Sequence, residues 1–166
     1  FRSWLHSIKN NKTKKLDSTQ TMWGLYNPFF SPDSRWLAIF DDGKLKRYST
    51  DTYEMNIICD ESVTFGGVWG DNDTIYFSPY EGSQLQSITL NSSSKPKTIM
   101  SDEILDSLGN DKNIQGFGRI DYLPNEKGIL FSSFHPITTA DYGTIFHLDL
   151  KTKELTPLIK NGFSPK

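Results

Sequence analysis

The sequence predicts an all-β protein built from repeated four-stranded antiparallel units. Three observations support this: an aromatic-rich composition, a polar turn motif that recurs, and the same series of strands after each turn. Aromatic residues make up 13% and hydrophobic residues 36% of the 166 residues. This mixture suits sheets whose strands alternate core and solvent positions. It does not suit a disordered chain, which cannot offset its conformational entropy by burial.

The turn motif lies between an aromatic strand end and a β-branched or aromatic strand, and it occurs three times. The three copies cover residues 27–40, 67–77 and 120–131. Proline, aspartate and asparagine supply each turn, because they preset φ or bond their own backbone. The interval is 39 residues from Pro32 to Asp71 and 53 residues from Asp71 to Pro124.

Each turn is followed by the same sequel, which is an alternating strand, a polar turn and a short last strand. The alternating strands are expected at 44–49, 84–90 and 144–150, the turns at 50–52, 91–94 and 151–153, and the last strands at 54–59, 97–100 and 154–159. A period near 40 residues with four strands per unit is the signature of a β-propeller blade.

An insertion explains the longer second interval. Ser101 is a good helix N-cap, and Asp102 and Glu103 favour the positive end of a helix dipole. Gly109 is suited to close the C-terminus. We therefore expect a two-turn helix from Ser101 to Leu108, followed by a loop up to residue 118.

The whole chain is expected to be a single β-propeller region with three complete blades flanked by partial ones. Blades that do not close a ring would present apolar end faces. We therefore expect self-association, or a longer chain whose remainder covers these faces. The expected parts of residues 1–166 are outer strands of a partial blade at 1–18, blades at 24–60 and 64–100, the helical insertion at 101–118, a blade at 119–160 and the start of another innermost strand at 161–166.

Charge and composition limit the partners. The net charge is −2, and basic and acidic residues are interspersed except for a cluster of Lys9, Lys12, Lys14 and Lys15. Such a run is usually a solvated hairpin loop, and no wider basic footprint indicates nucleic-acid binding. No stretch approaches the ~20 apolar residues of a membrane span, so we expect no direct membrane insertion. The single cysteine, Cys59, excludes an intrachain disulfide.

The sequence lacks the common catalytic motifs: no nucleophile elbow, paired cysteines, zinc-protease helix or phosphate loop occurs. We therefore expect no enzymatic activity, no cofactor and no metal. Asp41 and Asp42 precede Gly43, which favours a hairpin turn over a catalytic carboxylate pair. His147 is expected to be structural.

Candidate ligand-binding residues come from the innermost strands, which line the funnel of a propeller, and from a loop at 134–143. Arg119 and Asp121 share one innermost strand, where they would bind an anion or a peptide terminus, or pair with neighbours as structural ions. Trp36 and Trp69 are expected to fill the core between blades. The full set of candidates is Trp23, Tyr26, Asn27, Phe65, Arg119, Asp121, His135, Asp141 and Tyr142.

The Ser-Pro-Asp-Ser-Arg-Trp turn at 31–36 resembles the repeats of TolB-like and WD-type β-propellers. The strings at 42–47, 66–69 and 122–125 are similar to those of propellers fused to bacterial serine/threonine protein kinases. The second and third turns depart from this pattern, with Gly70-Asp71-Asn72 and Asn125-Glu126. The resemblance implies a six-bladed parent, a ligand- or protein-binding sensor role, and often a periplasmic or cell-surface location.

Three functions are compatible with this reading. The first is a non-catalytic module that binds a protein, peptide or small ligand. The second is the gating propeller of a prolyl-oligopeptidase-like serine peptidase, whose nucleophile would lie on another domain. The third is a lactonase- or lyase-type propeller enzyme with a metal in its channel, for which the innermost strands offer too few ligands. The first is favoured by the repeats and the resemblance, although a fold alone does not fix function.

Overall fold

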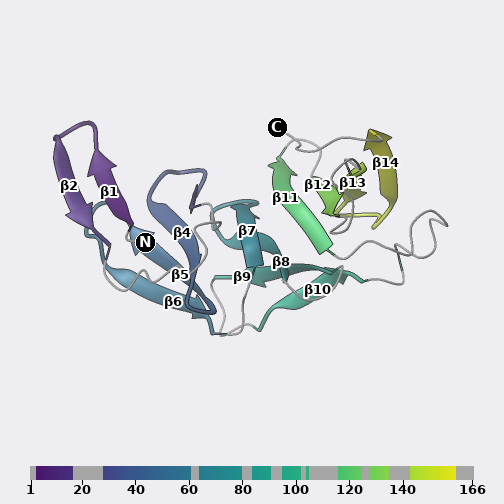
Figure 1. Cartoon of the computed structure of the whole chain (residues 1–166), viewed down its shortest axis with the longest axis horizontal. Coiled ribbons are helices and arrows are strands. Elements are labelled where there is room, and N and C mark those ends of the chain that lie inside the picture. The colour runs from purple at the N-terminus through teal and green to yellow at the C-terminus, as the bar shows by residue number, and fades with distance from the viewer. Residues whose placement is uncertain are drawn as a thin grey trace.

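The computed structural model describes residues 3–16, 28–60, 64–79, 84–90, 95–101, 104, 116–124, 128–134 and 143–159. In these ranges the protein consists of a two-stranded hairpin and three four-stranded antiparallel sheets. The sheets follow one another along an open arc, with β7 and β11, the first strands of the second and third sheets, toward the concave side (Figure 1). These sheets are the predicted blades.

Within each blade the strands pair in chain order, from the inner to the outer edge. The hairpin contains β1 (Trp4–Ser7) and β2 (Lys12–Lys15); the first blade contains β3 (Phe29–Phe30), β4 (Trp36–Asp41), β5 (Lys44–Ser49) and β6 (Met55–Cys59); the second contains β7 (Thr64–Trp69), β8 (Thr74–Pro79), β9 (Leu85–Thr89) and β10 (Lys97–Met100); the third contains β11 (Gly116–Leu123), β12 (Gly128–Phe134), β13 (Ile145–Asp149) and β14 (Leu155–Ile159).

The turn between β3 and β4 is organised by the hydroxyl of Ser31, which is buried. This hydroxyl donates to Asp33 Oδ1 at 2.6 Å and accepts the N–H of Trp36 at 3.0 Å. The Ser31 hydrogen bond, followed by the N–H of Arg35, lowers the pKa of Asp33. The Asp33 N–H reaches Asn72 Oδ1 at 3.1 Å, so the inner turns of neighbouring blades touch 39 residues apart.

The outer turns repeat as well. In the β5–β6 and β13–β14 turns, the side chain of Ser49 or Asp149 accepts the backbone N–H groups two and three residues later. Four residues after Ser49 and Asp149, Tyr53 and Lys153 have left-handed φ values of 64° and 63°. These N–H groups also lower the pKa of Asp149. The shared geometry supports the repeat read from the sequence.

Three apolar clusters fill the three spaces between successive sheets. The first joins Leu5 and Leu16 of the hairpin region to Leu37, Ile39 and Tyr48. The second lies between the first and second blades and includes Trp69, with Trp36 packed at its margin, as predicted. The third lies between the second and third blades. Its buried members are Leu85, Met100, Phe117, Ile129, Phe131, Phe146, Leu148 and Leu155.

Two predicted details differ in part. Of the basic cluster, Lys9 lies in the hairpin turn, but Lys12, Lys14 and Lys15 lie on β2 and not in a loop. Of the predicted insertion helix, the structure describes Ile104, which is helical and donates its N–H to Ser101 O at 3.1 Å. Ser101 is described and is not itself helical, and the other residues of that predicted helix lie outside the described residues. Within the described part, no helix is long and apolar enough to cross a membrane.

Candidate functional site

The inner strands of the second and third blades are bulged at the same position. In each, two residues of the inner strand stand opposite one residue of the neighbouring strand. Bulges bend a strand and re-aim its side chains, and they are common at rims and beside binding sites. The pairs that flank the bulges are Thr64–Pro79 and Gly67–Phe77 in β7, and Phe117–Ser133 and Ile120–Phe131 in β11.

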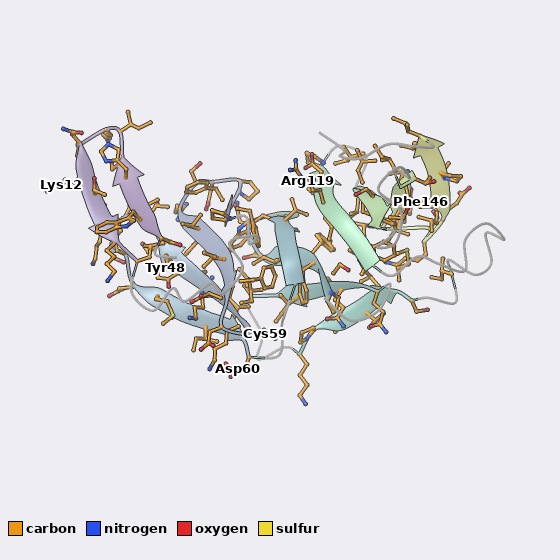
Figure 2. The ribbon with its side chains drawn as sticks, viewed as in Figure 1. Lys12, Tyr48, Cys59, Asp60, Arg119 and Phe146 are labelled. Carbon is orange, nitrogen blue, oxygen red and sulfur yellow. The ribbon has the colours of Figure 1, made fainter. Side chains whose placement is uncertain are left out.

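Arg119 lies within the β11 bulge, and its side chain is exposed. Figure 2 shows it on β11 at the concave side of the arc. A guanidinium in this place can present its planar set of N–H donors to a carboxylate or phosphate. We call the inner edge strands β7 and β11 around Arg119 the concave edge.

Asp121 lies two residues beyond Arg119 and is half-buried. Its Oδ1 accepts the N–H of Tyr122 at 2.9 Å. Asp121 stands opposite Leu130, whereas Ile120 and Tyr122 pack toward the second blade. Since neighbours along a strand point to opposite faces, Asp121 lies on the face of the third sheet that turns away from the second blade.

The side chains of the other predicted residues lie outside the described part of the chain, so their place in a site stays a prediction. For Phe65 the structure describes the backbone, which is in the bulged part of β7. The candidates that lie wholly outside the described residues are Trp23, Tyr26, Asn27, His135, Asp141 and Tyr142.

A buried ion pair was missed by sequence reasoning. Lys46 Nζ lies 2.7 Å from Asp41 Oδ2, with side-chain exposures of 5% and 0%. The predicted turn is confirmed for Asp42 and Gly43, whose φ values of 53° and 70° match a type I′ hairpin turn. Asp41 is instead the last residue of β4 and faces inward. The sequence signal for this burial was the alternation of side chains along the strands. It places Lys46 opposite Ile39, on the face of the first blade that the hairpin covers.

Two buried nitrogens, Arg47 Nε and His147 Nε2, lack a hydrogen-bond partner among the described residues. They occupy equivalent places, on the third strand of the first and third blades. The Arg47 guanidinium lies 4.3 Å from the centre of the Trp36 ring, which is a cation–π contact. His147 packs on Gly128, where an added Cβ would overlap Nε2. Each contact lies within a single blade, and the structural role expected for His147 stays a prediction.

Stacked tyrosines join the second and third blades. The Tyr76 and Tyr122 rings are 5.8 Å apart and nearly parallel, at 12°. Gly70 makes room for them, because a Cβ there would overlap the Tyr76 ring. Burial, with Tyr122 and Asp71 nearby, raises the pKa of Tyr76. Among the described residues, no group of three or more His, Cys, Asp or Glu is placed to hold a metal ion.

No protein-family model matches the sequence, and no curated protein matches it significantly. Solved structures do resemble it. The manganese complex of an oligogalacturonate lyase gives a TM-score of 0.63 at 15% identity, covering 95% of this chain and 46% of that one. The Cps50 (Swd1) β-propeller domain of Myceliophteria thermophila gives 0.63 at 9%, covering 93% and 50%. The tricorn protease gives 0.54 at 12%, covering 96% and 15%.

The fold is that of a β-propeller, present as an open arc of blades. The chain spans half or less of the length of these three structures. At such identities the likeness concerns the fold, which hosts enzymes and binding modules alike.

Proposed function

We propose that this chain is a non-catalytic binding module that recognises a protein or peptide at its concave edge. The observation that carries the proposal is the exposed Arg119 in the β11 bulge. An arginine held by a bulged inner strand is suited to a carboxylate, which a peptide offers at its C-terminus or on acidic side chains. β11 is also the inner edge strand of its sheet, so backbone groups on its open side can hydrogen-bond to an extended segment.

The sequence resemblance supports a sensor role of the same kind. The strings at 42–47 and 66–69, similar to kinase-fused propellers, lead us to propose a module that reports ligand binding to an attached domain. The same resemblance leads us to propose a periplasmic or cell-surface location. A gating propeller of a serine peptidase is the alternative, and it differs in one testable respect. A gate lets peptides pass, whereas a sensor retains them.

A selection from a phage-displayed library of random peptides tests the proposal. We expect peptides with acidic side chains or free carboxylates to be enriched. Hydrogen bonds to charged groups contribute roughly 1.5–3 kcal/mol, so Arg119→Ala should weaken binding about 10- to 100-fold in calorimetric titrations. Lys151→Ala is the matched control, because Lys151 is exposed on the outer β13–β14 turn. Failure to enrich any peptide, or equal binding by both variants, would count against the module.

A further inference from the structure

The tip of the β1–β2 hairpin combines exposed apolar and basic side chains. Ile8 opens the turn and is 92% exposed, and Lys9 and Lys12 beside it are also exposed. We call Ile8, Lys9 and Lys12 the hairpin tip. The hairpin stands at one end of the arc with this tip turned away from the sheets (Figure 1). Between Ser3 and Leu16 the chain carries four lysines and no acidic residue.

Specific contacts fix the conformation of the β1–β2 turn. Asn10 Oδ1 accepts the N–H of Lys12 at 3.2 Å, and Asn11 adopts a left-handed φ of 53°. One step further back, His6 Nδ1 and Thr13 Oγ1 are hydrogen-bonded at 2.8 Å. These contacts hold the turn in a shape that leaves Ile8 exposed. Transfer of this isoleucine side chain from water to an external apolar phase would be favourable in free energy.

We propose that the hairpin tip docks on an anionic lipid surface, with Lys9 and Lys12 among the headgroups and Ile8 in the apolar layer beneath. A membrane surface presents anionic headgroups at its outside and an apolar layer beneath them. This arrangement matches an apolar apex flanked by cations. A nucleic acid offers the charge without the apolar layer. It also calls for a wider basic footprint than this chain has.

The lysines at the base of the hairpin contribute less to this docking. Lys14 lies over the Tyr53 ring, 5.0 Å from its centre, and Lys15 is half-buried. The strand rise of about 3.3 Å per residue places Lys15 about 10 Å behind Lys12. That distance is about one Debye length at moderate salt, so the field of the headgroups is weaker there.

Docking at the hairpin tip is separate from ligand binding at the concave edge. Figure 2 places Lys12 at one end of the arc and Arg119 on the third blade, away from the hairpin. The inference therefore does not depend on the proposed function, and Arg119 would stay accessible on a membrane-bound molecule. It also requires no membrane-spanning segment.

Vesicle flotation with the 166-residue chain tests the inference. Vesicles of phosphatidylcholine with about a third phosphatidylserine should carry the protein, and vesicles of pure phosphatidylcholine should not. Removing one lysine near an anionic surface costs about fivefold in partitioning, so Lys9→Ala with Lys12→Ala should cost about 25-fold. Ile8→Asn should cost about tenfold, because the apolar contact is lost while the charge is kept. Lys151→Ala with Lys153→Ala, two exposed lysines of the β13–β14 turn, is the matched control.

Each alternative result overturns the inference. Absence of binding to anionic vesicles does so directly, and so does binding that the tip variants leave unchanged. Loss of binding in the lysine variant but not in Ile8→Asn would mean charge attraction without docking of the apex. Binding to a DNA duplex or to polyglutamate that depends on the two lysines, with no vesicle binding, would assign the tip to another anionic partner. All of the substituted side chains are exposed, so the variants should fold, which circular dichroism checks.

Discussion

Replacing Lys46 by methionine removes the positive charge that lies 2.7 Å from the Asp41 carboxylate. Methionine keeps an unbranched apolar stem of similar length. The Asp41 side chain is 0% exposed, so water cannot take the place of the lost ammonium. Breaking a buried pair in this way costs about 3–5 kcal/mol. This is a large part of the roughly 5–15 kcal/mol that stabilises a typical domain.

The neighbouring pair of Lys44 and Asp60 supplies a matched control. Its N–O distance is 3.3 Å, and its side chains are 37% and 69% exposed. Pairs of this kind contribute between about 0 and 1 kcal/mol, so Lys44→Met should change stability little. A double variant, Asp41→Leu with Lys46→Met, removes both buried charges. It should recover most of the loss, because an apolar pair of similar volume avoids the desolvation cost.

Urea unfolding followed by circular dichroism measures these differences. With a slope of about 1–3 kcal/mol/M, a loss of 3–5 kcal/mol lowers the midpoint by roughly 2 M. The reasoning would be refuted if Lys46→Met cost no more than Lys44→Met. It would also be refuted if the double variant were as unstable as the single one, because the loss would then come from shape and not from charge.

Three further predictions concern Gly128, Asp33 and the assembly of the chain. Gly128→Ala should destabilise by about 1–3 kcal/mol through overlap with His147, and His147→Ala in the same chain should restore the melting temperature. Because the folded pKa of Asp33 is lowered from 3.8, its carboxylate stabilises the fold above that pH and the effect is lost as pH falls through the folded value. Asp33→Asn should therefore lower the urea midpoint near neutral pH, and the difference from the parent chain should shrink as the pH falls below 3.8. Light scattering should give twice the 19.0 kDa chain mass, and a monomer would contradict self-association.

The blades could be predicted because their signals are local. Alternation gave the strand at 44–49, and the structure has β5 at Lys44–Ser49. The Asp42–Gly43 turn was predicted from residue types that accept positive φ, and both have it. The turn at Ser31 was found in the same way. Each of these features depends on residues within one hairpin, so a single sequence contains the information.

The buried charges and the site geometry could not be predicted, because they depend on neighbouring sheets. Asp41 was assigned to a turn since an aspartate before a turn is usually solvated, yet it pairs with Lys46 on the face of the first blade that the hairpin covers. Arg119 and Asp121 were expected either to bind an anion or a peptide terminus or to pair with neighbours as structural ions. In the structure Asp121 accepts the N–H of Tyr122 and stands opposite Leu130, an arrangement that residue types alone do not indicate.

The repeat indicates the fold but not the function, because equivalent positions of the blades carry different side chains. On the third strand, equivalent positions hold Arg47, Ser87 and His147 in the three blades, and each stands opposite a residue of the second strand. The residue that follows on the strand, Tyr48, Ile88 or Leu148, is buried in the core, whereas this position is half-buried in each blade and packing constrains it less. Variation of this kind is invisible to periodicity, so function has to be argued from single side chains such as Arg119 and Ile8. The cross-strand pairs formed at this position are Arg47 with Ala38, Ser87 with Tyr76, and His147 with Leu130.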